Sequence, residues 1–486
     1  MIPIAETRVA GLDEILGGGI PLRTMLLILG TPGAGKTILA EQVAVQQAKQ
    51  GKRVLIFTAL SESHEQLLTA LREFTFFDEA LIGDRIRFLS IQTILQDGLE
   101  ATADAIVEMA RTQEASVVVL DGFRGVTGFA SSGHDVRLFL YAVRTRLALL
   151  DVTSIVTLET SLDQESDTDV LTIADGIVRL HNTLWGVRHR RHIEVQKLRA
   201  MRHLNGLHAM AITTDGIRCY PRHEAVYRTT NYGVGPDRVA FGMPELDAML
   251  RGGLNQGTAT FLAGTPGVGK TLTALRYIMT GADMGEPGLF IALIESAGQL
   301  YDKAANFGMD LRGAVERGIV TLLSLPPVEM EVDVFAAMVR ERVERHGIRR
   351  LVIDSAAAVE EAIIEPHRAA SFFTSLLNYL REHGVTSVLT QERVSRSVFR
   401  DGDVLTTIIP DNTLLMRVVE YHNDRRRILS IAKMRQNDFD PGLREVRIAD
   451  GTIRVLPANE SDLGVLMGIA TQENREMHAI HTDGSA

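Results

Sequence analysis

The chain has 486 residues, 45% hydrophobic and 23% charged, which predicts a soluble globular protein of roughly two to four domains and excludes wholesale disorder. A single cysteine, Cys219, excludes an intrachain disulfide and a cysteine-based zinc cluster, and fits a reducing, cytoplasmic compartment. The net charge, 51 − 61 = −10 with neutral histidines, disfavours non-specific binding of nucleic acid or anionic lipid.

The first residues and the hydropathy pattern also argue against export or membrane insertion. Glu6 and Arg8 stand where a signal peptide would need an apolar core. No run approaches the roughly 18 apolar residues of a membrane span. We therefore expect a cytoplasmic protein.

Short apolar runs alternate with amphipathic stretches in the first half of the chain. This pattern predicts an α/β fold, a mostly parallel sheet flanked by helices. The runs are rich in β-branched residues and lack polar alternation, as expected of strands buried on both faces. A helix is predicted over 38–51, closing on a glycine. The predicted strands are 25–29, 54–60, 117–121 and 154–159.

The second half of the chain repeats the first. Each half has a Leu-Asp pair whose aspartate precedes a lysine by 23 residues, Asp13 before Lys36 and Asp247 before Lys270. Later landmarks keep the same offsets within two residues over 160 positions, so the chain is a tandem duplication with a shift of about 234. The second half is predicted to hold strands at 259–264, 289–295, 351–355 and 387–392, and a helix over 334–347.

The domain boundary is expected in the polar, turn-rich stretch 221–238. This predicts a first domain over 1–226 and a second over 227–456. The polar segment 457–486 is expected to form a flexible tail.

Both halves contain G-x-x-x-x-G-K-T between a predicted strand and a predicted helix. Glycines let such a loop wrap phosphate with inward N–H groups, while the helix N-terminus adds its positive end. The lysine would reach the β- and γ-phosphates of ATP, and the threonine hydroxyl would ligate Mg²⁺. A turn that binds nothing is the alternative, which two copies in register disfavour. The expected nucleotide-binding residues are Thr31, Gly33, Ala34, Gly35, Lys36 and Thr37, then Thr265, Gly267, Val268, Gly269, Lys270 and Thr271.

Four acidic residues stand at the ends of predicted apolar strands, at matched offsets in the two halves. Asp121 and Asp354 would hold Mg²⁺ through its water shell, although each could instead cap a helix. Glu62 and Glu295, in ALSES and ALIES, would orient and polarise the attacking water as catalytic residues. The alternative for both glutamates is an ordinary position in the first turn of a helix.

Taken together, the paired loops, the ALSES and ALIES strand ends and the late KLR and KMR triplets resemble the KaiC family. That resemblance covers about residues 8–456 and implies two tandem RecA-like P-loop domains. It also implies a homo-oligomeric ring, usually a hexamer, with ATP at subunit interfaces and a connection to circadian timing.

The resemblance further suggests that Lys197, Arg199, Lys433 and Arg435 act in trans on the neighbouring subunit's γ-phosphate. The cations would stabilise charge on the transferred group, as an arginine finger does. A solvated basic edge strand is the alternative. Basic stretches at 188–192 and 425–427 precede the triplets, either as solvated hairpin tips or as subunit contacts.

The sequence departs from the family at two points. The family carries two adjacent glutamates after its second strand, whereas Ser61 and Ile294 here leave one glutamate in each copy. The family can phosphorylate a Ser-Thr pair in its second domain, for which Thr406 and Thr407 are the nearest counterpart, with Pro410 shifting the spacing by one. These threonines could equally be β-formers leading into a strand.

The sequence therefore favours a ring-forming, clock-like or signalling ATPase that hydrolyses ATP with Mg²⁺ in both domains. Serine/threonine autokinase activity in the second domain is an added hypothesis. A RecA-like DNA motor and a nucleotide-dependent scaffold with little turnover are the alternatives. The regulatory protein partner is left open.

Overall fold

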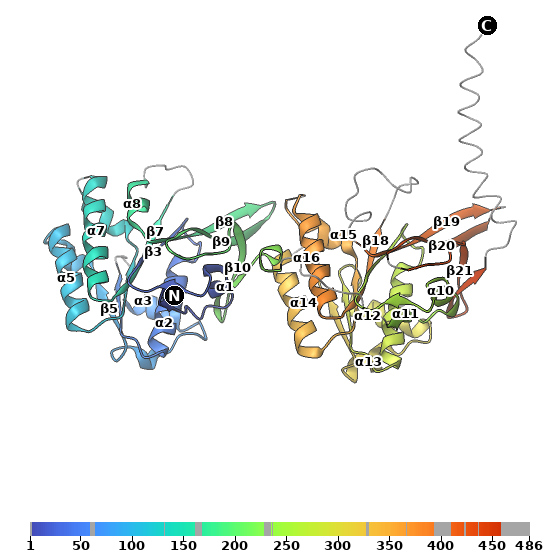
Figure 1. Ribbon diagram of the computed structural model, residues 1–486. Coiled ribbons are helices and arrows are strands. Elements are labelled where there is room, and N and C mark those ends of the chain that lie inside the picture. Colours follow the sequence, from blue (N-terminus) through green and yellow to red (C-terminus); the bar gives the residue numbers. More distant parts are fainter. Residues whose placement is uncertain are drawn as a thin grey trace, which may run out of the picture. The chain divides into compact units, whose positions relative to one another are not determined.

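The computed structural model describes most of both halves of the chain (Figure 1). It divides into two compact units, Met1–Val226 and Tyr227–Ala486. Glu62, Thr406, Thr407 and the tail from 458 lie outside the described residues. The described residues are 2–58, 64–130, 132–160, 168–227, 235, 237–326, 330–365, 367–392, 410–421, 424–435 and 437–457.

The first unit is built on a nine-stranded sheet in the order β11-β10-β9-β8-β3-β7-β6-β4-β5. Strands from β8 to β5 in this order are parallel, whereas β9, β10 and β11 continue the sheet as antiparallel neighbours. The strands are β3 Met25–Gly30, β4 Val54–Thr58, β5 Ile86–Ser90, β6 Val117–Asp121, β7 Thr153–Glu159, β8 Gly176–Trp185, β9 Arg188–Leu198, β10 Leu207–Thr213 and β11 Gly216–Tyr220.

The second unit repeats this order strand for strand, as β16-β15-β17-β18-β14-β19-β20-β21-β22. Strands β16 to β19 in this order are parallel, and the last three are antiparallel. The expected pair of α/β domains with mostly parallel sheets is therefore confirmed. The strands are β14 Ala259–Gly264, β15 Gly288–Ala292, β16 Val320–Ser324, β17 Arg350–Asp354, β18 Thr386–Glu392, β19 Asn412–Tyr421, β20 Asp424–Met434, β21 Arg444–Ala449 and β22 Thr452–Pro457.

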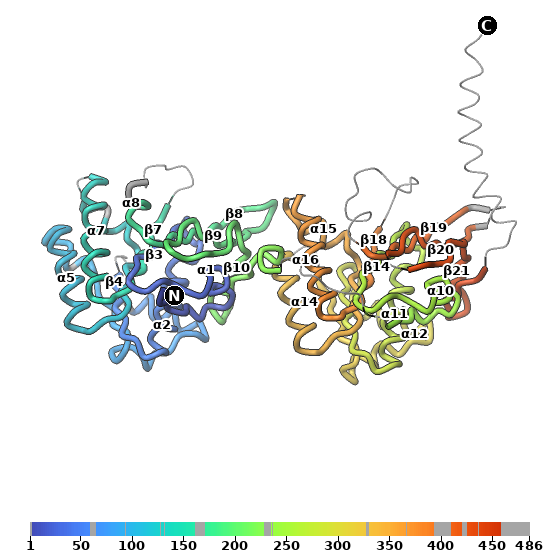
Figure 2. Tube along the Cα trace, viewed as in Figure 1, coloured from blue at the N-terminus to red at the C-terminus, as the bar shows by residue number. Residues whose placement is uncertain are grey.

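Helices cover both faces of each sheet, as the trace in Figure 2 also shows. On β3, Leu26 and Ile28 belong to the core that includes α2, whereas Leu27 and Leu29 belong to the core that includes α5 and α7. Burial on both faces explains why these strands lack polar alternation. The main helices are α2 Lys36–Lys49, α3 His64–Leu71, α5 Leu99–Thr112, α7 Gly133–Leu149, α8 Thr168–Ile173, α11 Lys270–Asp283, α12 Ala297–Asn306, α13 Leu311–Glu316, α14 Val332–His346 and α16 Arg368–Glu382.

Shorter elements complete the two units. They are β1 Ile4–Ala5, α1 Leu12–Leu16, β2 Ile20–Pro21, the 3-10 helix Glu79–Leu81, α4 Gln92–Leu95, α6 Arg124–Thr127, α9 His223–Val226, β12 Arg238–Val239, α10 Pro244–Met249, β13 Leu254–Asn255 and α15 Ala356–Glu361.

The strand predicted over 289–295 ends three residues early, at Ala292. Leu293 still donates its N–H to the Asp354 carbonyl at 2.8 Å, but the chain then turns into α12. Ser296 caps that helix in a reciprocal pair with Gln299, and this cap draws the preceding residues away from the sheet. Glu295 is therefore beyond the strand end and not on it.

The Leu-Asp pairs of the repeat have a structural role. Asp13 accepts hydrogen bonds from the N–H groups of Thr7 and Arg8, and Asp247 accepts the matching bonds from Phe241 and Gly242. In each unit the carboxylate thus fixes the segment that leads into the first helix.

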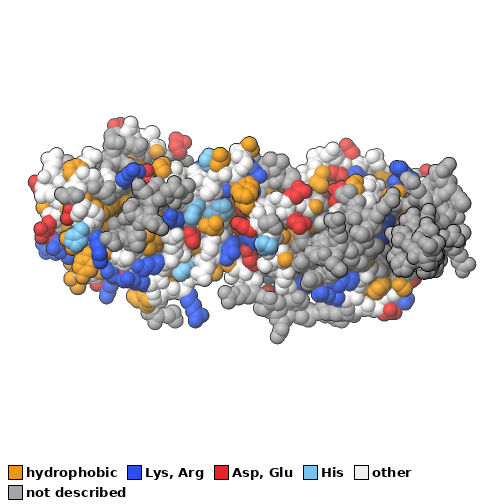
Figure 3. Space-filling view, turned by 90° about the horizontal axis from the view of Figure 1, so that it is seen from above, with side chains coloured by type: hydrophobic (Ala, Val, Ile, Leu, Met, Phe, Trp, Pro, Cys, Tyr) orange, Lys and Arg blue, Asp and Glu red, His pale blue; other side chains and the backbone are white. Residues whose placement is uncertain are grey.

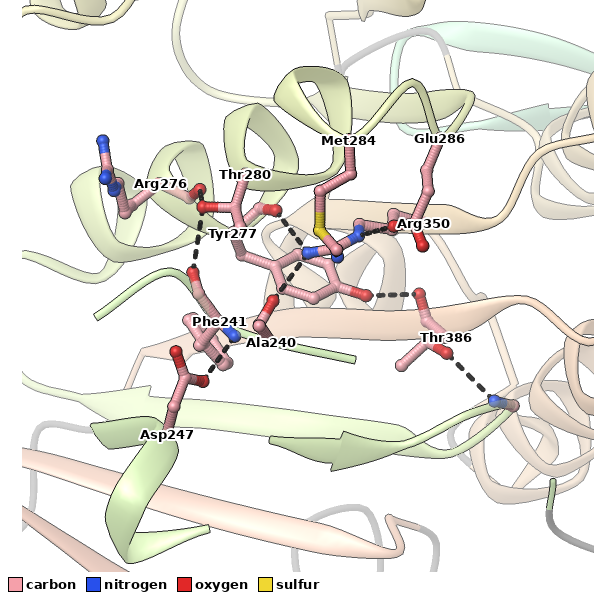
Figure 4. A network of polar contacts seen from close by, with 11 residues as sticks. Ala240, Phe241, Asp247, Arg276, Tyr277, Thr280, Met284, Glu286, Arg350 and Thr386 are labelled. Atoms are coloured by element: carbon pink, nitrogen blue, oxygen red, sulfur yellow. Dashed lines mark hydrogen bonds and ion pairs between the residues drawn. The ribbon is translucent and has the colours of Figure 1, made fainter. Parts of the chain in front are cut away.

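The second unit adds a buried arginine to this region (Figure 4). The Arg350 side chain is 1% exposed and its Nε lies 2.5 Å from Glu286 Oε2. Its Nη1 donates to the carbonyls of Ala240 and Tyr277, at 2.7 and 3.0 Å, and the guanidinium lies 4.9 Å from the Tyr277 ring centroid. The Tyr277 hydroxyl in turn donates to the Thr386 carbonyl. This network joins the first segment of the unit to α11, β17 and β18.

Candidate functional site

The first phosphate loop joins β3 to α2. Gly33 and Gly35 have φ angles of 72° and 102°, a region that glycine enters without the cost a side chain imposes. An added Cβ at Gly33 would meet no atom within 4 Å, so this side of the loop is open to a ligand. Lys36 Nζ lies 2.9 Å from the Thr31 carbonyl, across the loop. The residues present therefore fit a phosphate group.

Asp121 ends β6 beside this loop. Thr37 Oγ1 lies 3.2 and 3.1 Å from its two carboxylate oxygens, and Thr157 Oγ1 donates to Oδ1 at 2.6 Å. Burial raises the pKa of Asp121, while the bonds from Thr157 and Thr37 oppose that rise. A hydroxyl and a carboxylate in contact beside a phosphate loop are the donor set that Mg²⁺ takes when phosphate oxygens complete its shell.

The second phosphate loop has the same form. Gly267 and Gly269 have φ angles of 73° and 107°, and a Cβ at Gly267 would meet nothing within 4 Å. Lys270 Nζ lies 2.9 Å from the carbonyls of both Gly264 and Thr265. Asp354 ends β17, and its Oδ1 accepts a hydrogen bond from Thr390.

The lysine of each loop is partly buried, and burial lowers the pKa of Lys36 and of Lys270. Glu159 opposes this at Lys36 and Glu392 opposes it at Lys270. These glutamates end β7 and β18, the strands beside each phosphate-loop strand. They keep negative charge close to each loop lysine.

Glu295 lies beyond β15 at the same edge of the sheet as Asp354. Its carboxylate oxygens lie 2.5 and 2.7 Å from Lys303 Nζ on α12, and its side chain is 26% exposed. Because the Glu295 carboxylate is accessible to water and lies near the ends of the parallel strands, it is placed where it could orient a water molecule. Its first-unit counterpart, Glu62, falls outside the part of the chain that the structure describes.

Lys197 and Arg199 lie near the start of the phosphate-loop strand β3, whereas their own phosphate loop follows the other end of that strand. The Arg199 N–H bonds to the Asp175 carbonyl, and the Asp175 N–H bonds to the Met25 carbonyl, so these residues are level with the start of β3. Gly30, where the loop begins, is five residues further along, or about 17 Å.

The second unit repeats this placement. The Arg435 N–H bonds to the Asp411 carbonyl and the Asp411 N–H to the Ala259 carbonyl, five residues before Gly264. In both units the register shifts just before the lysine, between Ile177 and Val178 and between Thr413 and Leu414 on the neighbouring strand. Such an irregularity re-aims the side chains that follow it.

The basic stretches lie away from these lysines. Residues 188–192 begin β9, opposite the end of β8, and 425–427 lie near the start of β20. Both therefore belong to long hairpin strands, at the ends remote from the Lys-Arg pairs.

Three kinds of residue in the site are not predicted by motif. Thr157 and Thr390 anchor the two aspartates, and Glu159 and Glu392 face the loop lysines. Their spacing was an available signal, because each threonine follows its aspartate by 36 residues. The third is Glu41 on α2, which is fully buried, with neither carboxyl oxygen hydrogen-bonded within the described residues.

Two α/β domains that each place a G-x-x-x-x-G-K-T loop between a central strand and a helix define a tandem P-loop nucleotide-binding protein. A family model for the KaiC ATPase matches residues 5–224 and matches again over 239–460. The chain belongs to the KaiC ATPase family and is a P-loop ATPase. The resemblance noted from the motifs is thus confirmed.

Individual relatives agree along nearly the whole chain. A protein of Picosynechococcus sp. named circadian clock oscillator protein KaiC is 27% identical, over 98% of this chain and 94% of its own length. A Synechocystis sp. protein named circadian clock oscillator protein KaiC 1 is 27% identical, over 91% and 87%. A Thermostichus vulcanus protein named circadian clock oscillator protein KaiC is 26% identical, over 96% of this chain and 91% of its own length.

Charged side chains of both signs are spread over the face shown in Figure 3. Among the helices that the structure describes, none is both long enough and apolar enough to cross a membrane.

Proposed function

We propose that each domain binds ATP with Mg²⁺ and hydrolyses it between two copies of the chain, within a cytoplasmic homo-oligomeric ring, as in a clock-like or signalling ATPase. Lys36 and Thr37 would bind the nucleotide and its metal in the first domain, with Asp121. Lys270, Thr271 and Asp354 would do so in the second. The metal would neutralise charge on the β- and γ-phosphates.

The placement of Lys197 and Arg199 carries this proposal. They lie about 17 Å along the strand direction from the start of their own loop, farther than an arginine side chain extends. A cation pair at that edge can serve a γ-phosphate only if another copy of the chain presents it. Lys433 and Arg435 have the same relation to the second loop.

Glu62 and Glu295 are proposed as the residues that orient the attacking water. At Glu295 this requires the carboxylate to exchange its ion pair with Lys303 for a water molecule beside the γ-phosphate. Binding of a neighbouring copy would then couple assembly to turnover, because each nucleotide biases the packing of two chains.

The mass of the assembly tests the proposal. With ATP and Mg²⁺ the native mass should be a multiple of 53.4 kDa, with six copies expected, and it should fall when nucleotide is removed. Arg199→Ala and Arg435→Ala should each reduce ATP turnover while leaving nucleotide affinity within about twofold. A chain that stays monomeric with ATP and retains full turnover would contradict the proposal.

Phosphoryl transfer to Thr406 or Thr407 is proposed as a second reaction of the second domain. The described residues that follow them, Pro410 and Asp411, lie at the edge that carries Lys433, whose Nζ donates to the Pro410 carbonyl at 2.8 Å. A γ-phosphate brought to that end of the strands by a neighbour would be near Pro410 and Asp411, which follow the two threonines in the chain. Mass spectrometry after incubation with ATP should find phosphate there and none in the Thr406→Ala, Thr407→Ala double variant. Unmodified threonines under conditions that support hydrolysis would remove this proposal.

A further inference from the structure

Each unit carries a largely buried aspartate between the phosphate-loop strand and the Lys-Arg pair. The Asp175 side chain is 8% exposed and the Asp411 side chain 13%. Neither belongs to the phosphate loops, the metal site or the cation pairs described above. Both precede the strand that separates the phosphate-loop strand from the Lys-Arg strand, β8 in the first unit and β19 in the second.

Asp175 connects three parts of the first unit. Arg144 on α7 donates from Nε and Nη2 to its two carboxylate oxygens, each at 2.7 Å, which is the strong bidentate form of an ion pair. The Met25 N–H, at the start of β3, donates to Oδ2 at 3.1 Å. Arg199 donates its N–H to the Asp175 carbonyl at 2.9 Å, and its Nη1 lies 3.4 Å from Oδ1.

Asp411 makes the corresponding contacts in the second unit. Arg381 on α16 donates to its Oδ2 from Nη2 at 2.7 Å and from Nε at 3.0 Å. The Ala259 N–H, at the start of β14, donates to Oδ2 at 2.9 Å, and the Arg435 N–H donates to the Asp411 carbonyl at 2.9 Å. One aspartate per unit therefore joins a helix, the strand leading to the phosphate loop and the arginine just beyond the Lys-Arg strand, the last through its backbone carbonyl.

The charges explain why an aspartate is suited to this place. Arg144, Lys197 and Arg199 bring three cations close together, and their repulsion favours splayed side chains. Burial and Arg199 lower the pKa of Lys197, whereas Asp175 raises it. The carboxylate offsets this repulsion while leaving the Arg199 side chain 52% exposed.

We propose that Asp175 and Asp411 are positioning residues, which hold the two cation pairs in the orientation that they need at the nucleotide of a neighbouring copy. This inference rests on the proposed function, because it requires the pairs to act across an interface. Fixed cations stabilise transition-state charge without reorganising during the reaction, and loosened cations lose that advantage. Through the same aspartate, each arginine is linked to the start of the strand that leads to its own phosphate loop.

Turnover by the first domain alone gives the cleanest test. Every chain carries Glu295→Gln, to silence the second domain, and Asp175→Asn is compared with the parent. The expected result is a fall in kcat of about tenfold with KM for ATP little changed, since an interaction used only in the transition state is lost. A higher KM with unchanged kcat would overturn the inference, because it would mean that Asp175 serves its own nucleotide site.

Mixed assemblies separate positioning across an interface from a structural role within one chain. Glu62→Gln chains, which also carry Glu295→Gln, are added to the Asp175→Asn chains. They contribute an intact Asp175 and Arg199 but little turnover, and their rate alone is subtracted. The turnover of each Asp175→Asn chain should rise severalfold, because its nucleotide now meets an intact cation pair. No rise would overturn the inference.

An Arg199→Ala chain, mixed in the same way, distinguishes the two levels of failure. If Arg199→Ala is rescued and Asp175→Asn is not, the positioning role is wrong and the proposed function stands. If neither variant is rescued, the cation pairs do not act across an interface, and both the positioning role and the proposed function are wrong. Asp151→Asn, which weakens a surface ion pair with Arg23 in the same unit, should leave kcat unchanged.

A second variant decides the matter if Asp175→Asn does not fold. Arg144→Lys keeps the positive charge but loses the bidentate geometry. It should reduce kcat by about threefold and be rescued by the Glu62→Gln chains in the same way. An unchanged kcat in this variant would count against the inference.

Discussion

Glu41 lies one helical turn beyond Thr37, fully buried on α2, and Leu275 occupies the matching position of the second unit. Burial, with a smaller contribution from the Asp121 charge, raises the pKa of Glu41 well above its usual value. A carboxylic acid that has no hydrogen-bond partner in the described structure costs stability wherever the unfolded chain would ionise it. The two copies have thus diverged one helical turn beyond the threonine of the phosphate loop.

Glu41→Leu should stabilise the first unit, and the gain should depend on pH. Because the folded pKa is raised, the unfolded state releases this proton first, so the parent loses stability as pH rises from about 4.5 toward the folded pKa. The variant removes that loss, and we expect a gain of about 1–3 kcal/mol at pH 8 and less at pH 5. Chemical denaturation at both values measures it. The exposed Glu100→Leu is the control, and an equal gain at both pH values would contradict the explanation.

At the scale of single residues, much of the site could be predicted from the sequence, because the residues of a phosphate loop are adjacent along the chain. The glycines, the lysine and the threonine are adjacent, and the same set recurs 234 residues later, as Lys36 and Lys270 show. Thr157 and Asp175 could not be assigned, since their roles depend on which strands become neighbours. Only the sheet order brings Asp175 beside both Met25 and Arg199.

At the scale of elements, the apolar strands of both sheets were predictable because they are buried on two faces. The antiparallel strands were harder to predict from the sequence. Along β9 buried and half-exposed residues mix, and its length of eleven residues includes the basic stretch at 188–192. The end of β15 was predicted wrongly, because the capping of α12 by Ser296 overrides the apolar run through Ile294.

Arg350 should be the strongest single anchor among the polar contacts of Figure 4. Arg350→Ala removes its hydrogen bonds to Ala240 and Tyr277 and leaves a cavity under α11, so the free energy of unfolding of the second unit should fall by about 3–5 kcal/mol. Denaturant unfolding measures this change. The neighbouring Arg349→Ala, at an exposed position, should cost less than about 0.5 kcal/mol. Similar losses in the two variants would show that the network contributes little.

At the scale of the whole molecule, the opening of the first unit can be followed separately from that of the second through a single cysteine. Cys219 is the only cysteine of the chain and lies in the first unit, 3% exposed. Burial raises the pKa of its thiol to about 12, so the thiolate that reacts with alkylating agents is scarce in the folded state. Its modification therefore reports opening of the first unit.

ATP should slow alkylation of Cys219 through the first phosphate loop. At a concentration 100 times Kd, and with no binding to the open form, the rate should fall about 100-fold. Lys36→Ala should abolish this protection, whereas the matched Lys270→Ala should preserve it. Mass spectrometry of the alkylated chain measures the rates. Equal protection in both variants would mean that the first loop does not hold the nucleotide.

The distance between each phosphate loop and its own cation pair has a consequence for geometry. A contact between the phosphate loop of one copy and the cation pair of the next joins two unlike surfaces. Copies joined in this way form a row, and an open row leaves an unused loop at one end and an unused cation pair at the other. Only a row that closes on itself uses every surface. A copy that lacks its cations would disable one junction of a closed row, but would end the growth of an open one, and titrating such a copy would reveal which kind of row forms.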